Sequence, residues 1–217
     1  MKAILFGPPG SGKGTYASRL QAKLDVDVIA MGDILREIMK GDSELGRRVK
    51  RFVEKGLLVP DEVVIEVLKK RLAKIPRNRG FILDGFPRTI EQAEALDKIM
   101  KMDVIILLTV PDWIIVERLS TRRICRKCGE VYNIRYLKPK VEGVCDKCGG
   151  QLYQRSDDTV EVIRDRIKVY DLQTQPILNR YKKKNVPFVG SKCESLDMPP
   201  EEAVETILKQ LKRLRMA

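Results

Sequence analysis

The first fifteen residues carry the feature that most restricts the fold of this chain. An apolar segment, Lys2–Phe6, leads directly into the glycine-rich stretch GPPGSGKGT at residues 7–15. Gly7, Gly12 and Lys13 have the spacing G-x-x-x-x-G-K of a phosphate-binding loop. Such a loop directs backbone N–H groups and the positive end of a helix dipole at phosphate oxygens, and its glycines leave room for the phosphate. The sequence therefore predicts a strand, a phosphate-binding loop and a helix in succession.

The rest of the chain alternates between short apolar segments and amphipathic helical ones. Nearly continuous apolar character is typical of strands in a parallel sheet covered on both faces, and it predicts strands over residues 2–6, 27–30, 80–83, 103–109 and 186–189. Helical periodicity predicts helices over residues 13–24, 61–73, 90–100, 111–122, 159–183 and 200–214. This alternation favours an α/β fold of three layers with a five-stranded parallel sheet and right-handed crossovers.

Two segments do not fit this alternation, and we interpret them as insertions in one core. Residues 31–59 are helical without a strand, and residues 123–157 are rich in Gly, Cys and Lys. The core then consists of residues 1–30, 60–122 and 158–217. A length of 217 residues suits one large domain with small insertions.

The composition indicates a protein that binds polyanions. With 42 Lys and Arg against 30 Asp and Glu, the formal charge of +12 favours nucleotides or nucleic acid as partners. Because the chain has no histidine, catalysis by a histidine of this chain is excluded. The longest apolar segment, residues 104–110, is far too short to cross a bilayer, and the phosphate loop lies directly at the N-terminus. We therefore expect a cytoplasmic protein without membrane contact, whose thiols stay reduced.

Four cysteines in the second insertion have the spacing of a metal site. Cys125 and Cys128 form one C-x2-C pair, and Cys145 and Cys148 form another. Each pair brings two sulfurs to one side of a turn, so that two pairs complete a tetrahedron around Zn²⁺. Two disulfides or buried thiols are the alternatives, and reduced thiols argue against the first and paired spacing against the second. Since four thiolates leave no open coordination position, the expected zinc is structural.

A carboxylate and several arginines are expected at the carboxyl ends of the strands, where ligands bind in open α/β sheets. Asp84 follows an apolar strand, and an acid at this position of phosphate-loop proteins holds Mg²⁺; a helix cap or a turn is the structural alternative. Guanidinium groups bind phosphate through paired hydrogen bonds and stay charged. Those expected to border the same crevice are Arg36, Arg88, Arg118, Arg122, Arg123, Arg155, Arg164 and Arg166.

These motifs together resemble the adenylate kinase family. They are GPPGSGKGT, GDILR at residues 32–36, LVPDE at 58–62, DGFPRT at 84–89 with Gln92, RLSTRR at 118–123, and two aspartates at 157 and 158 with Arg166. Their order and spacing match over nearly the whole chain, and the cysteine block resembles the zinc-bearing lid of the long-form enzymes. The family also has glycine at the position of Gly14, where many phosphate-binding loops carry Ser or Thr.

The resemblance implies reversible phosphoryl transfer, MgATP + AMP ⇌ 2 ADP, by a P-loop core with a monophosphate-binding insertion and a closing lid. It implies that ATP binds Gly10, Ser11, Gly12, Lys13, Gly14, Thr15, Arg118, Arg122 and Tyr132. It implies that AMP binds Met31, Arg36, Leu58, Val59, Gly85, Arg88, Gln92, Arg155 and Arg166. The catalytic groups would be Lys13, Asp84, Arg88, Arg122, Arg155 and Arg166, with Asp84, assisted by Asp33, orienting the Mg²⁺ shell, and with Asp157 and Asp158 tying the lid to the core. We expect a monomer whose partners are ATP, AMP and ADP.

Two departures and two alternatives stay open at this point. Met31 stands where the family often has threonine, and Asn133 replaces a histidine common in the lid, so the contacts to both bases can differ. A kinase for another monophosphate, UMP or CMP, is the nearest alternative, although Gln92 favours AMP. A nucleic-acid-binding protein with a zinc ribbon is a distant one, because it leaves Asp84, Arg88 and the phosphate loop unexplained.

Overall fold

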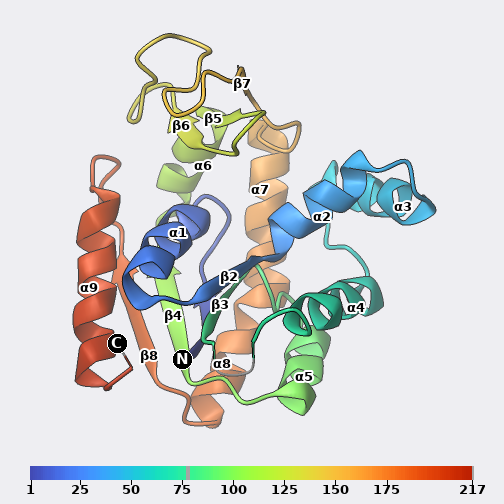
Figure 1. Ribbon diagram of the computed structural model, residues 1–217, viewed down its shortest axis with the longest axis vertical. Coiled ribbons are helices and arrows are strands. Elements are labelled where there is room, and N and C mark those ends of the chain that lie inside the picture. The colour runs from blue at the N-terminus through green and yellow to red at the C-terminus, as the bar shows by residue number, and fades with distance from the viewer. Residues whose placement is uncertain (77–78, 217) are drawn as a thin grey trace.

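Five parallel strands form the centre of the molecule in a computed structural model that describes residues 1–76 and 79–216 (Figure 1). The strands are β1 Lys2–Phe6, β2 Asp27–Ala30, β3 Phe81–Asp84, β4 Val104–Thr109 and β8 Phe188–Lys192. Their order in the sheet is β2-β3-β1-β4-β8, and each pair of neighbours is parallel. The predicted α/β fold around a five-stranded parallel sheet is therefore confirmed. Residues 77, 78 and 217 of the expected core lie outside the described residues.

Helices cover both faces of this sheet because the strand residues alternate between two apolar clusters. Ile4 and Phe6 of β1 pack on one side, and Ala3 and Leu5 pack on the other. The helices are α1 Lys13–Leu24, α2 Met31–Lys40, α3 Glu44–Val53, α4 Asp61–Leu72, α5 Ile90–Ile99, α6 Asp112–Ser120, α7 Val160–Val169, α8 Pro176–Lys183 and α9 Pro200–Arg213. Buried residues of α1 and α9 belong to the cluster of Ala3 and Leu5, while those of α4, α5 and α8 belong to the other. Three layers result.

Both segments interpreted as insertions have their own secondary structure. Residues 31–59 contain α2 and α3, which project to the right in Figure 1. At the top of Figure 1, a second sheet has the antiparallel order β6-β5-β7, with β5 at Arg122–Cys125, β6 at Val131–Asn133 and β7 at Leu152–Tyr153.

Three element boundaries expected from the sequence are wrong. The helix predicted over residues 111–122 ends at Ser120, because Arg122 already pairs with Asn133 in the second sheet. The helix predicted over residues 159–183 is interrupted by a π turn, η1 Tyr170–Thr174, next to Pro176, which lacks the N–H that a regular helix needs. The last strand lies later than residues 186–189, since its pairing with β4 runs from Phe188 to Lys192.

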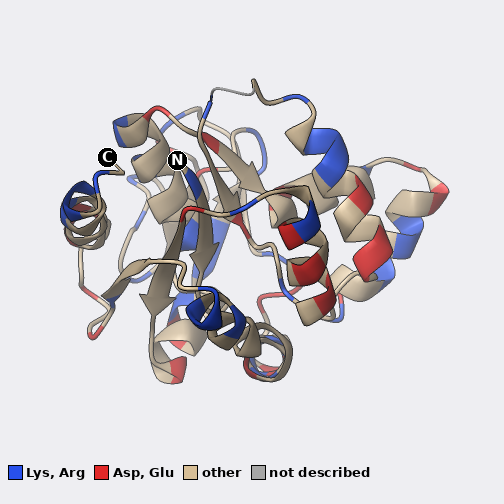
Figure 2. Cartoon of the chain, turned by 90° about the horizontal axis from the view of Figure 1, so that it is seen from below, with Lys and Arg blue, Asp and Glu red and all other residues tan. Residues whose placement is uncertain are grey.

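Charge is distributed over many elements of the fold. Figure 2 shows Lys and Arg interleaved with Asp and Glu along the helices in the view from below. Within the part of the chain that the structure describes, no helix is long and apolar enough to cross a membrane.

Candidate active site

A cavity of about 1190 Å³ lies at the carboxyl ends of the parallel strands. It exceeds the volume usual for one drug-sized ligand, about 300–1,000 Å³. The expected nucleotide-binding residues that line it are Gly10, Gly12, Lys13, Gly14, Thr15, Met31, Arg36, Leu58, Val59, Asp84, Gly85, Arg88, Gln92, Arg118, Arg122, Tyr132, Arg155 and Arg166. Ser11 is not among the lining residues because its side chain is fully buried. Arg123 and Arg164, expected to border the crevice, do not line it either.

The phosphate-binding loop has the backbone that its glycines predict. Gly10 and Gly12 have φ angles of 75° and 90°, which side-chain-bearing residues rarely adopt. A Cβ on Gly10 would also lie 2.9 Å from the Leu119 side chain. Helix α1 then begins at Lys13 with no acidic residue in its first turn, so the positive end of its dipole faces the loop without a competing carboxylate.

Lys13 lies at the base of the cavity, folded onto the loop itself. Its ammonium donates hydrogen bonds to the carbonyls of Gly7, at 2.7 Å, and Pro8, at 2.8 Å. Burial lowers the pKa of Lys13 to about 7, and although the nearby Asp84 opposes this, Arg88 adds to it. A phosphate would supply the negative charge that this buried ammonium lacks.

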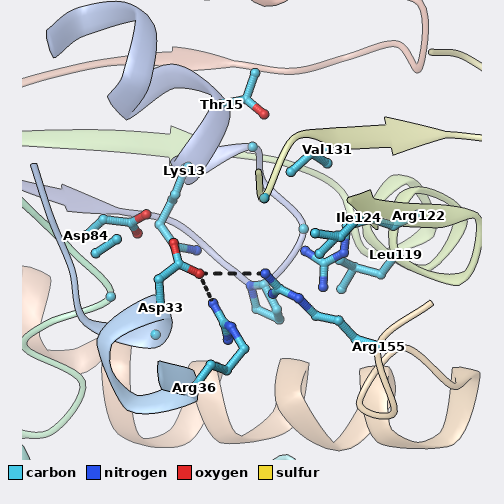
Figure 3. A pocket seen from close by; sticks show the side chains of 18 of the residues that line it. Lys13, Thr15, Asp33, Arg36, Asp84, Leu119, Arg122, Ile124, Val131 and Arg155 are labelled. Atoms are coloured by element: carbon cyan, nitrogen blue, oxygen red, sulfur yellow. Dashed lines mark hydrogen bonds and ion pairs between the residues drawn. The ribbon is translucent and has the colours of Figure 1, made fainter. Parts of the chain in front are cut away.

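Two carboxylates stand beside Lys13. Asp84 ends β3 in register with Leu5 and Ala30 of the neighbouring strands, and burial raises the pKa of Asp84 although Lys13 opposes the shift. Asp33, in the first turn of α2, accepts a hydrogen bond of 2.5 Å from Arg36 and lies 3.7 Å from Arg155. Figure 3 shows both arginines reaching toward Asp33 on the side of the cavity where Asp84 and Lys13 lie. Carboxylate oxygens of this kind are the ligands that Mg²⁺ prefers.

Two arginines of the cavity, Arg88 and Arg155, are buried beside other arginines. Burial lowers the pKa of Arg88 to about 10, with a further contribution from Arg166. Burial also lowers the pKa of Arg155 to about 10, with contributions from Arg122 and Arg36, and its buried Nε has no hydrogen-bond partner among the described residues. An anion would relieve the mutual repulsion between these buried guanidinium groups, so the cluster is suited to binding one.

Two aspartates hold the arginines at the junction of the two sheets. Arg122, at the start of β5, donates to both oxygens of the fully buried Asp158 carboxylate at 2.6 and 2.8 Å. Arg166, on α7, lies 2.9 Å from Asp157 and 3.5 Å from Asp158. These pairs connect the second sheet to the helix that returns to the core.

The side chains expected to contact the bases make firm contacts within the protein. Gln92 is 1% exposed; its Oε1 accepts from the Arg88 N–H at 2.7 Å, and its Nε2 donates to Asp61 at 2.7 Å. One amide hydrogen and one lone pair remain for a ligand. The hydroxyl of Tyr132 accepts from the Asp146 N–H at 2.8 Å and lies 3.4 Å from the sulfur of Cys145, so it faces the cysteines.

Sequence reasoning did not assign a role to several residues around this cavity. Asp61 lay inside the LVPDE motif without a role, and Thr174, which bonds to the Arg88 carbonyl, has no local pattern that would reveal it. The segment 196–200 before α9 also lines the cavity. Cys193 is buried and accepts a hydrogen bond of 3.1 Å from Arg118.

The four cysteines of the second sheet fit a zinc ion. Their sulfurs all lie within 4.8 Å of one another, with Cys125 and Cys148 3.4 Å apart and Cys128 and Cys145 3.6 Å apart. Zn–S bonds of about 2.3 Å in a tetrahedron place the sulfurs about 3.8 Å apart, close to these separations. At Gly150, a Cβ would lie 2.8 Å from the Cys125 sulfur, so only glycine leaves the cluster undisturbed.

Comparison with known proteins finds one family, both in a family model and in the relatives of this chain. A family model described as adenylate kinase matches residues 5–186. An adenylate kinase of Caldicellulosiruptor bescii is 48% identical over 212 residues, which cover 95% of this chain and 99% of that protein. The adenylate kinase of Archaeoglobus fulgidus is 45% identical over 217 residues, covering 98% and 100%, and that of Thermosipho africanus is 45% identical over 212 residues, covering 95% and 99%.

Proposed function

The chain belongs to the adenylate kinase family, and from this premise we propose how its cavity carries out that family's reaction, the reversible transfer of a phosphoryl group from MgATP to AMP to give two ADP. One observation carries the proposal: Lys13, two carboxylates and a cluster of buried arginines converge on one cavity large enough for more than one small ligand.

The chemistry needs charge stabilisation and positioning more than proton transfer. The nucleophile is a phosphate oxygen of AMP, which is already ionised, so the absence of histidine is no obstacle. We assign Lys13 and the loop N–H groups to the transferring phosphates of ATP, and Arg122, Arg155 and Arg166 to the charge that develops in the transition state. In this role Lys13 leaves the Gly7 and Pro8 carbonyls and turns to the phosphate.

Magnesium would be held near Asp84 and Asp33, whose oxygens suit it. When bound with ATP, the ion would supply positive charge that offsets the negative charge of the phosphate groups. Asp84 keeps its carboxylate at the end of a fixed strand, which gives the ion shell a rigid reference point. Asp33 would contribute its carboxylate from the first turn of α2, in residues 31–59.

We assign the part of the cavity lined by α2, Leu58–Val59 and Gln92 to AMP. Arg36 and Arg88 would bind its phosphate, and Gln92 would use its remaining amide hydrogen and lone pair on the adenine edge, with Met31, Leu58 and Val59 as apolar neighbours. Because the amide matches the donor and acceptor order of adenine, which uracil reverses, Gln92 favours AMP over UMP. Cytosine has the same order as adenine, so the proposed preference over CMP rests on membership of the family. A nucleic-acid-binding function would leave the convergence of Asp84, Arg88 and the phosphate-binding loop on this cavity unexplained.

We also propose a division of the chain into a core and two insertions that close over the substrates. Residues 31–59 would form the monophosphate-binding insertion, and residues 123–157 the lid, with 1–30, 60–122 and 158–217 as the core. Closure of both insertions over the substrates would exclude water and prevent hydrolysis of ATP. The four cysteines would hold one Zn²⁺ that stabilises the lid and takes no part in the chemistry. We further propose a monomeric cytoplasmic enzyme; light scattering tests the first point.

The assignment is tested by ADP formation from MgATP with AMP, UMP and CMP as acceptors. AMP should be the preferred acceptor, and Lys13→Ala and Arg88→Ala should each lower the rate by about 10²–10³, the usual cost of losing one preorganised charge contact. Arg164→Ala is the matched control, because this arginine lies on α7 beside Arg166 but outside the cavity. Near-normal rates in the two site variants, or equal rates with AMP and CMP, contradict the proposal.

A further inference from the structure

The main chain of Arg88 is held from both sides by other side chains. Its N–H donates to Gln92 Oε1 at 2.7 Å, and its carbonyl accepts from Thr174 Oγ1 at 2.9 Å. Its guanidinium also donates to the Gly85 carbonyl at 2.9 Å. A long side chain reaches a fixed point only if its backbone is fixed, so these bonds determine where the Arg88 charge can lie in the cavity.

Thr174 supplies the carbonyl contact from an unusual place in the chain. It is 6% exposed and is the last residue of the π turn η1, in which the Gln175 N–H bonds to the Tyr170 carbonyl at 2.8 Å. A helical threonine commonly bonds to a carbonyl of its own preceding turn. This one instead bonds to a residue 86 positions earlier, and π turns are frequent at functional sites.

Asp61 fixes the other partner of Arg88. Its two oxygens accept from Gln92 Nε2 at 2.7 Å and from Thr89 Oγ1 at 2.9 Å, and Thr89 Oγ1 in turn accepts from the Gln92 N–H at 3.1 Å. A carboxylate only accepts, and a backbone N–H such as that of Arg88 only donates. Both ends of the Gln92 amide are therefore held in one orientation, which sets the order of the free donor and acceptor in the cavity.

We propose that Thr174 and Asp61 are positioning residues for the AMP site, with Thr174 acting through Arg88 at the phosphate and Asp61 acting through Gln92 at the base. This inference rests on the proposed roles of Arg88 and Gln92. Neither residue would touch the reacting atoms, but each would affect the affinity for AMP or the preference for its base. The π turn near Pro176 would then serve to place the Thr174 hydroxyl against the Arg88 carbonyl.

The Thr174 contact is tested by Thr174→Val, which keeps the shape and removes the hydroxyl, and by Thr174→Ser, which keeps the hydroxyl. Loss of one such bond should raise the KM for AMP about threefold to tenfold, with the KM for ATP within about twofold, and Ser should restore the wild-type value. In an Arg88→Ala background, Thr174→Val should have no further effect. An unchanged KM for AMP in Thr174→Val, or an equal increase in the Arg88→Ala background, overturns the assignment.

The Asp61 contact is tested by Asp61→Ala against Glu62→Ala. Both acids lie in the first turn of α4, but Glu62 pairs with Arg48 at 3.1 Å and has no contact with Gln92. Only Asp61→Ala should raise the KM for AMP, and it should also lower the preference for AMP over inosine monophosphate, whose base edge reverses donor and acceptor, by about threefold or more. Equal losses in the two variants, or an unchanged base preference, overturn this part.

Two measurements separate failure of this inference from failure of the proposed function. If Arg88→Ala leaves AMP binding unchanged by calorimetry, the assigned role of Arg88 itself is wrong; if only Thr174→Val is silent, the positioning role alone is wrong. Thr121→Val is the control for loss of a buried threonine hydroxyl that has no bond to Arg88 or Gln92, since the Thr121 hydroxyl donates to the Glu117 carbonyl and accepts from the Asn133 side chain. Its AMP affinity should equal that of the wild type. Thermal unfolding of each variant confirms that it is folded.

Discussion

The two sheets of this molecule differ in how many apolar side chains they bury. The five-stranded sheet lies between two large apolar clusters, and residues such as Ile4, Leu83 and Ile105 are fully buried there. The apolar cluster of the three-stranded sheet consists of Cys125, Tyr132, Cys145 and Leu152, with Cys148 packed against it. Small modules with so little apolar surface need a metal or a disulfide. The difference teaches that one chain can combine a part stabilised by burial with a part that has little burial of its own, for which we propose stabilisation by metal coordination.

The largest expected effect is the unfolding of one sheet while the other stays folded. Cys145→Ser, or removal of the metal by a chelator, should unfold residues 123–157 while the parallel sheet stays folded, because structural zinc contributes about 10–16 kcal/mol of apparent binding energy in isolated fingers. Elemental mass spectrometry measures the metal, and hydrogen exchange of the two sheets measures the local unfolding. Cys193→Ser, a cysteine outside the cluster, should keep the metal. Native protein purified without chelator and free of zinc would falsify this view of the lid.

The junction between the sheets should give the next largest effect. Asp158→Ala removes the partner of two guanidinium groups, Arg122 and Arg166, at a site where its own side chain is fully buried. Breaking a buried ion pair on one side costs about 3–5 kcal/mol, since the remaining charge is left unpaired. Denaturant unfolding measures the loss, and Glu161→Ala, an exposed acid in the first turn of α7, serves as the control. A loss no larger than that of the control would mean that the junction contributes little.

Removing a buried side chain from the parallel sheet should lower the free energy of unfolding of that sheet and leave the lid unaffected. Leu83→Ala removes a fully buried side chain from β3, and such changes cost about 2–5 kcal/mol. We expect this loss in global unfolding with an unchanged metal content, whereas Leu137→Ala in the exposed part of the lid segment should cost little. If Leu83→Ala also releases the metal, the two regions are not independent, and the comparison needs revision.

The smallest expected effect comes from the buried charge of Lys13, at the start of α1 beside the parallel sheet. The pKa of Lys13 is about 7 in the folded protein against an ordinary value of 10.5, so the unfolded chain binds more protons between these pH values. The stability of the ligand-free protein should therefore rise with pH from about 7 to 10.5, and Lys13 should add no slope below this window. Unfolding at pH 7 and pH 9 of the wild type and of Lys13→Met measures the difference. An equal pH dependence in both proteins would show that Lys13 does not titrate there.

The sequence by itself determined the features that local patterns encode. The order of strands and helices around a parallel sheet, the phosphate-binding loop at residues 7–15 and the paired cysteines follow from apolar periodicity and from spacing, which act over a few neighbouring residues. The same spacing identified Lys13, Asp84 and Arg88 as residues of one crevice, because the carboxyl ends of parallel strands meet at one edge of the sheet.

Only the tertiary structure decided which side chains act on one another across the chain. Thr174 meets Arg88 and Asp61 meets Gln92 over separations of 86 and 31 residues, so no window of sequence contains either pair. The start of β5 at Arg122 depends likewise on a partner outside the preceding helix, since Arg122 pairs with Asn133. The hydroxyl of Tyr132 turns toward Cys145 because the two cysteine turns and β6 fold together. Side-chain hydrogen bonds are short and directional, and their partners are known only once the backbone has brought them within about 3 Å.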